Sequence, residues 1–216
     1  MKMETLTSES FSEMVSPGRT ALLVIDVQND FCSPTGVIGH AGVDMSVLDA
    51  PIARIQQLIA AARAAGVTVA FARVMTKPAT DSTALKLFYL RQGKPLEYLN
   101  LCRIGTPGVD YYVVKPQEGD IEIEKPQYSS FMATQFEHDL RARDIDPLVV
   151  TGFTTDCCVD TTVRDAFHRN FNSFVVSDAT AAYDEELHAG SLNALSKNCA
   201  ILVETKDLLE VWKPID

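Results

Sequence analysis

The chain has 216 residues, 46% of them hydrophobic, which is enough for one domain with a sizeable core. Its formal net charge of −10 would repel nucleic-acid backbones and anionic lipid surfaces. No apolar run is long enough to cross a membrane, and no apolar segment of a secretory signal occurs near the start. We expect one domain over residues 20–216 after a polar arm over residues 1–19, with no nucleic-acid or membrane partner. The arm could be disordered or pack on a neighbouring subunit.

The cysteines are odd in number and scattered along the chain. They are Cys32, Cys102, Cys157, Cys158 and Cys199. In the absence of a secretory signal, this distribution favours reduced thiols over a disulfide scaffold. A cytoplasmic location is the default expectation.

The first regular element is an apolar run of strand length at residues 21–25, which stops at Asp26. A continuous run of this kind is typical of a parallel strand that is buried on both faces. From Pro51, apolar residues recur at helical spacing, which predicts a helix that ends at Gly66. A strand at residues 67–71 follows and completes a β-α-β unit.

The same alternation of strand and helix returns after Asp120. The expected elements are a strand at 121–124, a helix at about 133–143, a strand at 147–150, a helix at about 156–168, a strand at 173–176, a helix at about 185–197 and a strand at 200–203. This order favours a three-layer α/β/α fold with a mostly parallel central sheet. The connection at residues 75–113 is rich in glycine and proline and is typical of a binding loop or lid.

Three polar side chains stand at or just beyond the carboxyl ends of expected strands: Asp26, Lys125 and Cys158. Ligands of open parallel sheets bind at this edge, so the three could converge. Cys158 lies at a helix start, where unpaired N–H groups and the helix dipole favour a thiolate nucleophile. Lys125 could add positive charge, and Asp26 could act as general acid and base. The amides from Thr154 to Cys158 could hold an oxyanion.

Each of these residues also has a structural interpretation. Asp26 could be a turn carboxylate, Lys125 a solvated strand end and Cys158 a small buried residue at a helix start. Cys157 could pack, act as a redox partner, or form a vicinal disulfide with Cys158. A thiol redox protein that uses these two cysteines is therefore one alternative function.

Three motifs follow one another along the chain. They are Leu23-Val24-Ile25-Asp26-Val27-Gln28-Asn29-Asp30-Phe31, Glu124-Lys125-Pro126-Gln127-Tyr128-Ser129-Ser130-Phe131 and Thr151-Gly152-Phe153-Thr154-Thr155-Asp156-Cys157-Cys158-Val159. In this order they resemble the isochorismatase-like cysteine hydrolases, a group that includes biuret hydrolase, ureidoacrylate amidohydrolase and N-carbamoylsarcosine amidohydrolase. The resemblance runs from about residue 20 to residue 210, most of the chain.

By motif position, the resemblance implies the isochorismatase-like hydrolase fold, with Asp26, Lys125 and Cys158 as the catalytic triad. It also implies a cis peptide bond between Phe153 and Thr154, which would turn the Thr154 and Cys158 amides toward an oxyanion. This chemistry requires no cofactor. The family's habit of assembly, together with helices that have wide apolar faces, implies a homo-oligomer, either a dimer or a tetramer.

The resemblance further implies that Gln28 and Tyr128 contact a small amide or carbamoyl group and that Phe31 closes one wall. Arg73, which follows the strand expected at residues 67–71, could bind a substrate carboxylate through a bidentate contact. The residues Tyr128, Phe31 and Gln28 could equally be core or wall residues.

Two departures from sister activities narrow the chemistry. Nicotinamidases of the group hold a metal through an Asp-x-His pattern and a further histidine, and residues 39–44 lack that pattern, so we expect no metal site. True isochorismatases lack the nucleophilic cysteine, so Cys158 favours hydrolysis of a C–N bond. The sequence therefore predicts a cysteine amidohydrolase that cleaves a small amide, ureide or carbamoyl compound through a thioester and releases ammonia or an amine. A non-catalytic binding protein of the same fold is the second alternative.

Overall fold

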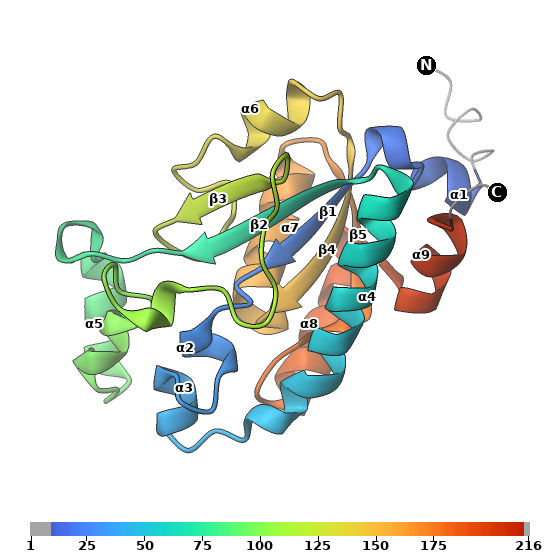
Figure 1. Ribbon diagram of the computed structural model, residues 1–216. Helices are drawn as coiled ribbons and strands as arrows, with labels where there is room; N and C mark the ends of the chain where they lie inside the picture. The colour runs from blue at the N-terminus through green and yellow to red at the C-terminus, as the bar shows by residue number, and fades with distance from the viewer. Residues whose placement is uncertain (1–9, 214–216) are drawn as a thin grey trace.

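A computed structural model of the chain describes residues 10–213. Its centre is a six-stranded sheet in which all neighbouring strands are parallel, in the order β3-β2-β1-β4-β5-β6 (Figure 1). The strands are β1 (Ala21–Ile25), β2 (Thr68–Val74), β3 (Ile121–Lys125), β4 (Pro147–Phe153), β5 (Asn172–Ala181) and β6 (Ile201–Val203). The expected α/β architecture is confirmed, with a sheet that is wholly parallel.

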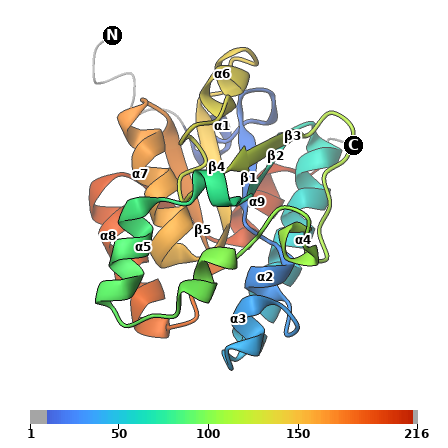
Figure 2. The same cartoon turned by 90° about the vertical axis from the view of Figure 1, so that its left-hand side faces the viewer.

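Helices cover both faces of this sheet. The α-helices are α1 (Phe11–Met14), α2 (Asn29–Cys32), α3 (Val37–His40), α4 (Asp49–Ala65), α5 (Thr83–Arg91), α6 (Phe136–Arg141), α7 (Asp160–His168), α8 (Glu185–Asn198) and α9 (Thr205–Val211). The shorter turns are η2 (Pro17–Arg19), η3 (Met45–Leu48), η4 (Pro78–Thr80), η5 (Leu96–Asn100), η6 (Pro107–Val109) and the π-turn η7 (Thr155–Val159). Residues of α4 and α9 pack on one face, and residues of α6, α7 and α8 pack on the other (Figures 1 and 2).

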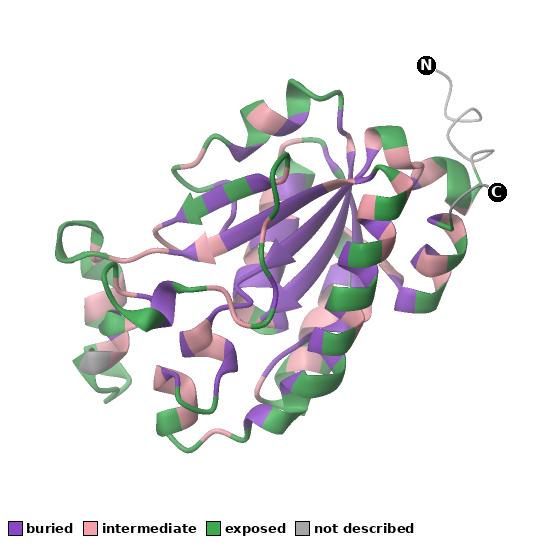
Figure 3. Cartoon of the chain, in the orientation of Figure 1, coloured by how far each residue is buried: buried purple, intermediate pink, exposed green. Residues whose placement is uncertain are grey.

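Strand β1 shows why the central strands are apolar throughout. Leu22 and Val24 belong to the core cluster on the α4 face, whereas Leu23 and Ile25 belong to the cluster on the α7 face. Every residue of β1 is buried (Figure 3). A strand that is covered by helices on both sides has no side chain facing water, so no polar residue alternates with the apolar ones.

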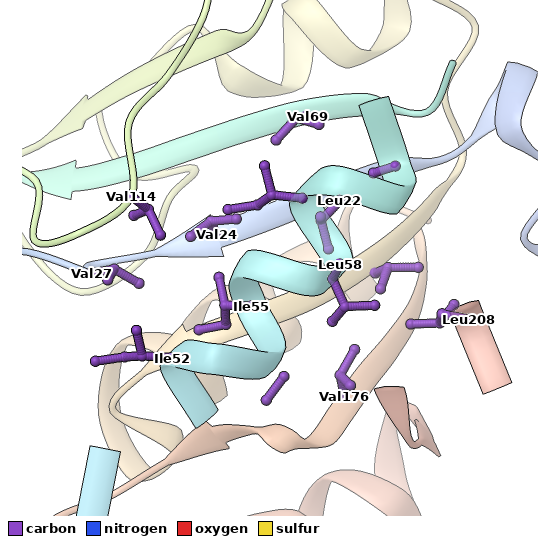
Figure 4. Packing of buried hydrophobic residues seen from close by; sticks show 14 of the residues in the cluster. Leu22, Val24, Val27, Ile52, Ile55, Leu58, Val69, Val114, Val176 and Leu208 are labelled. Atoms are coloured by element: carbon purple, nitrogen blue, oxygen red, sulfur yellow. The ribbon is translucent and has the colours of Figure 1, made fainter. Parts of the chain in front are cut away.

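Helix α4 supplies most of the apolar surface on its face of the sheet. Its Ile55 and Leu58 pack with Leu22 and Val24 of β1 (Figure 4). The helix ends at Gly66, which has a φ of 79° and closes the last turn through its N–H. A left-handed residue is easiest to place when it is glycine. The expected helix end is therefore confirmed.

Part of the expected N-terminal arm packs on the body of its own chain. The Trp212 indole Nε1 donates to the Val15 carbonyl oxygen at 3.0 Å, and both residues are fully buried. The Phe11 ring meets the Phe174 ring edge-on, with 6.0 Å between centroids. Part of residues 10–19 thus packs on the core of its own chain through apolar side chains. Residues 1–9 lie outside the described part of the chain.

Some elements differ in length from the sequence expectation. Helix α6 is shorter than the helix expected at residues 133–143, because the left-handed backbone of Ala133, with a φ of 56°, interrupts any helix that would begin there. Strands β4 and β5 continue beyond their expected ends. The longer β4 brings Phe153 to the edge of the sheet.

The connection at residues 75–113 lies beyond the carboxyl ends of β2 and β3 (Figure 1). It contains α5 and the turns η4, η5 and η6. Figure 2 looks toward this edge of the molecule, with α5 nearest the viewer. The segment is therefore placed where a parallel sheet binds its ligands.

Gly152 is expected to be indispensable to the packing of β4 against β1. Its φ is 108°, and a Cβ at this position would lie 2.1 Å from the carbonyl oxygen of Ile25. Gly152→Ala should lower the free energy of unfolding by at least about 2 kcal/mol, because two central strands must move apart. Denaturant unfolding would measure the loss.

Gly190 in α8 offers the matched control. A Cβ added at Gly190 would meet no atom within 4 Å, and alanine favours a helix more than glycine does. Gly190→Ala should therefore leave the free energy of unfolding unchanged or raise it by up to about 1 kcal/mol. Equal unfolding midpoints for the two variants would contradict this account of β4.

Candidate active site

Asp26 and Lys125 form a buried ion pair at the carboxyl edge of the sheet. Asp26 directly follows β1 with a φ of 54°, and Lys125 is the last residue of β3, two strands away. The Lys125 Nζ donates to the Asp26 Oδ2 at 2.7 Å and to the Gln127 carbonyl oxygen at 3.0 Å. The two side chains are 0% and 1% exposed. The topology therefore brings together two groups that are 99 residues apart in sequence.

The second carboxylate oxygen of Asp26 is left without a donor. This atom, Oδ1, is buried and makes no hydrogen bond to any residue between 10 and 213. A buried acceptor without a partner costs roughly 1–3 kcal/mol, so its presence calls for an explanation. An open acceptor site on a carboxylate is suited to receiving a proton from a neighbouring acid.

The electrostatics of the pair depend on both members. Burial raises the pKa of Asp26 above its ordinary value, while the charge of Lys125 and the neighbouring Cys158 thiol oppose that rise. Burial alone would lower the pKa of Lys125, but the negative charges of Asp26 and Cys158 outweigh it and raise this pKa. Each charge is thus retained in the interior because the other is present.

The chain turns sharply after β4 and places Cys158 beside this pair. The peptide bond between Phe153 and Thr154 is cis, as the sequence resemblance implied. The π-turn η7 follows, and its first turn is held by the Thr154 carbonyl oxygen, which accepts the N–H of Cys157 at 3.1 Å. Cys158 therefore lies at the start of a helical segment that continues as α7, where backbone N–H groups lack helical partners.

The Cys158 thiol is held in its protonated form in the resting site. A hydrogen bond with Cys157, burial and the negative charge of Asp26 raise the pKa of Cys158 well above its ordinary value, and Lys125 opposes them only in part. The sequence suggested a thiolate favoured by the helix start, whereas the hydrogen bond with Cys157, burial and the Asp26 charge raise the pKa and act in the opposite direction. The nucleophile must therefore be generated by proton transfer.

Cys158 lines a cavity of about 740 Å³. Phe31 and Tyr128, both expected as substrate contacts, also line it. The 75–113 connection contributes much of the remaining wall, including Leu85, Phe88, Tyr89, Lys94, Tyr98 and Leu99. The connection expected to form a binding loop or lid therefore lies in the wall of this cavity. Asp26 and Lys125 lie behind the cysteine, out of contact with solvent.

Two expected substrate contacts do not line this cavity. The Gln28 amide is fully buried, where it donates to the carbonyl oxygens of Val74 and Val109 at 2.9 Å each and accepts the Val74 N–H at 2.7 Å. Arg73 instead pairs with Glu124 at 2.7 Å. Gln28 therefore fastens backbone segments together, and Arg73 is occupied by a neighbouring strand, so neither is available to a ligand in this cavity.

Asp30 is a buried carboxylate whose role the sequence alone did not reveal. It accepts the backbone N–H of Cys102 at 2.7 Å and that of Val37 at 3.3 Å. A Cβ on Gly108 would lie 2.1 Å from the Asp30 carboxylate, so the 75–113 connection approaches this group very closely. Asp30 thus anchors the wall of the cavity to α2, and an acidic residue inside the first motif was its only sequence signal.

His188 is a second contributor that the sequence assigned only to a helix. From α8, its Nδ1 lies 2.8 Å from the Thr155 hydroxyl oxygen in the π-turn. Burial lowers the pKa of His188, although the charges of Glu185 and Asp156 oppose this effect. The imidazole is therefore neutral at pH 7 and supports the turn that carries the nucleophile through a hydrogen bond.

All five cysteines are free thiols. Within residues 10–213, no group of three or more His, Cys, Asp or Glu side chains is arranged to hold a metal ion. In the same range, no helix combines the length and the apolar character needed to cross a bilayer.

Comparison with known proteins agrees with this geometry. The isochorismatase domain family matches residues 20–207. The chain belongs to the isochorismatase family. Ureidoacrylate amidohydrolase RutB of Methylobacterium radiotolerans is 39% identical over 194 residues, which cover 82% of this chain and 73% of that protein. RutB of Pantoea ananatis is 34% identical over 205 residues, which cover 85% of this chain and 82% of that protein.

Solved structures of the family share the fold. A cysteine hydrolase from Pseudomonas syringae pv. phaseolicola superposes with a TM-score of 0.79 at 28% identity and covers 91% of this chain and 93% of its own. The N-carbamoylsarcosine amidase of Thermoplasma acidophilum gives a TM-score of 0.68 at 25% identity, with coverage of 87% and 96%. The relatives of this isochorismatase-family hydrolase thus include amidohydrolases of the cysteine hydrolase type.

The pH dependence of Cys158 alkylation should report its surroundings. On a Cys157→Ala background, which leaves one thiol in the turn, the iodoacetamide rate should rise only as pH exceeds about 8.5, the ordinary thiol value. Adding Asp26→Asn should shift this rise to lower pH, because a negative charge that disfavours the thiolate is removed while Lys125 remains. Mass spectrometry of the modified peptide gives the rates. A profile that stays in place or moves to higher pH would rule out Asp26 as the neighbour that sets this pKa.

Proposed function

We propose that this protein is a cysteine-dependent amidohydrolase that cleaves a C–N bond in a small amide, ureide or carbamoyl compound through a thioester. The observation that carries the proposal is a buried Lys125–Asp26 pair behind a cysteine that lines a cavity of about 740 Å³. A thiol, a base with an open acceptor atom and a fixed positive charge are the groups that thiol-mediated acyl transfer requires. The names of its relatives, ureidoacrylate amidohydrolase and N-carbamoylsarcosine amidase, describe the same reaction class.

In the first half-reaction, Asp26 removes the proton from Cys158 as the sulfur attacks the substrate carbonyl carbon. The unpartnered Oδ1 is the proposed acceptor, since Oδ2 is engaged by Lys125. Lys125 stabilises the thiolate that forms, because its charge already favours ionisation of this thiol. Proton transfer thus occurs together with substrate attack, and the resting enzyme keeps a neutral thiol.

The tetrahedral intermediate requires donors for its oxyanion. We assign this role to the backbone N–H groups of Thr154 and Cys158, which belong to the turn after the cis peptide bond. Preorganised amides of this kind stabilise developing charge without reorganising during the reaction. His188 contributes indirectly, because it holds the Thr155 hydroxyl in the same turn.

Collapse of this intermediate completes the chemistry. Asp26 returns its proton to the departing nitrogen, so ammonia or an amine leaves and the acyl group stays on Cys158 as a thioester. A water molecule that is deprotonated by the same carboxylate then attacks the thioester carbonyl and frees the acid. The thiol is regenerated, and the protons balance over the two steps without any further reagent.

The shape of the cavity restricts the substrate. Phe31 and Tyr128 supply aromatic walls on the side of the nucleophile, and both line the cavity. Tyr128 remains 39% exposed, so its ring is accessible to a ligand. A planar amide or ureide can lie against such walls while its carbonyl faces the oxyanion amides.

Ammonia release should identify the reaction and its nucleophile. The test panel contains biuret, N-carbamoyl acids, ureidoacrylate, maleamate and nicotinamide. Turnover of an accepted compound should fall by at least about 1,000-fold in Cys158→Ala, because the thiol proposed to form the thioester is removed. Asp26→Asn should lower turnover by roughly 100- to 10,000-fold through loss of general acid-base catalysis.

Cys199→Ala serves as the control, because Cys199 follows the end of α8 and does not line the cavity. It should retain the wild-type rate. Release of ammonia that survives Cys158→Ala would refute the assigned nucleophile. Silence across the panel, combined with an unreactive Cys158, would favour the alternative of a non-catalytic binding protein.

A further inference from the structure

The cavity wall carries one cation that has no carboxylate partner. Its charged lining residues are Asp81, Lys94 and Asp156. Asp81 is neutralised by Arg103, whose two terminal nitrogens lie 2.7 and 3.3 Å from its carboxylate oxygens. Lys94 makes no ion pair within the described residues, and it is the only Lys or Arg among those that line the cavity.

Aromatic rings hold the Lys94 ammonium. Its Nζ lies 5.9 Å from the ring centroids of both Phe88 and Tyr89, and its backbone N–H donates to the Tyr89 carbonyl oxygen at 2.9 Å. A cation over an aromatic face gains only about 0.5–1 kcal/mol at an exposed site. The three N–H groups of the ammonium also stay available to donate hydrogen bonds to an anion. Lys94 is thus positioned but still able to bind a ligand.

Tyr89 connects this cation to the nucleophile. The Tyr89 ring centroid lies 5.9 Å from the Lys94 Nζ, and ionisation of Cys157 or Cys158 would raise the pKa of the Tyr89 phenol. All four residues line the same cavity. The ammonium and the reacting sulfur therefore border one cavity, and an extended substrate within it can contact both.

The net negative charge of the protein increases the importance of a local cation for binding an anionic substrate. With a net charge of −10, the protein repels anions on average, so an anionic substrate needs a local positive group in the cavity. Arg103 cannot serve because Asp81 occupies it, and Arg73 is paired with Glu124 outside the cavity. Lys94 remains as the residue that can perform this function.

We propose that Lys94 binds a carboxylate at the end of the substrate remote from the scissile bond. The substrate class is then the N-carbamoyl or amide derivatives of short carboxylic acids, and uncharged ureides are the poorer substrates. The inference rests on the proposed amidohydrolase function for the scissile end. Lys94 does not take part in bond cleavage; it determines which substrates are selected.

The first experiment compares each accepted acid with the alcohol that carries CH₂OH in place of the carboxylate. Lys94→Met should lower kcat/KM for the acid by about 10-fold or more, which is the usual effect of losing a charge-assisted hydrogen bond, and change the value for the alcohol by less than about twofold. Lys94→Arg should recover much of the loss. Lys86→Met, on α5 just before the segment that carries Lys94 but outside the cavity lining, should behave as wild type.

A second measurement tests the anion site without requiring hydrolysis. Glutarate should slow the alkylation of Cys158 by iodoacetamide in the Cys157→Ala protein, and Lys94→Met should abolish this protection. Equal protection with and without Lys94, or an equal fall in kcat/KM for acid and alcohol, would overturn the proposal. If no panel compound is hydrolysed while protection still depends on Lys94, the carboxylate site stands and the hydrolase function fails.

Discussion

A buried ammonium and a buried carboxylate lie 2.7 Å apart at the centre of this molecule, and the rest of the site is arranged around them. Lys125 and Asp26 come from β3 and from the end of β1, so the pair can form only if β2 separates those strands in the parallel order observed. Removal of one partner from such a pair typically costs 3–5 kcal/mol, because the other charge is left buried and uncompensated. The ion pair therefore links the topology of the sheet to the protonation states on which thiol chemistry depends.

The wall and the floor of the cavity are built from different kinds of structure. The floor consists of strand ends and one tight turn, where side chains have almost no freedom. The wall is the 75–113 connection, which is irregular and rich in aromatic side chains and is tied down at separate points. Asp30 binds the Cys102 amide, and Gln28 binds the carbonyl oxygens of Val74 and Val109. The 75–113 connection can thus vary separately from Asp26, Lys125 and Cys158, because it belongs to a different segment of the chain.

Strand position and motif resemblance pointed to Asp26, Lys125 and Cys158, which the structure brings to one edge of the sheet, but they did not place Gln28 and Arg73 correctly. Asp26, Lys125 and Cys158 were recognisable because each lies at or beyond the carboxyl end of an expected strand, and parallel strands bring these ends to one edge. Gln28 lies in the same motif as Asp26, yet its amide is consumed by backbone partners. Arg73 was expected to face a ligand, but the neighbouring strand supplies Glu124 as its partner. Such partners come from other strands, so they cannot be predicted from the local sequence around Gln28 or Arg73.

The sequence by itself determined the alternation of strands and helices, the residues proposed to carry the chemistry and the position of the 75–113 connection. These properties depend on local periodicity, on turn residues such as Gly66 and on motifs. Only the tertiary structure decided that the surroundings of Cys158 raise its pKa and that, among residues 10–213, the Asp26 Oδ1 has no hydrogen-bond donor and Lys94 has no ion-pair partner. These properties depend on burial and on charges contributed by distant segments, because the free energy of a charge is set by everything that surrounds it in space.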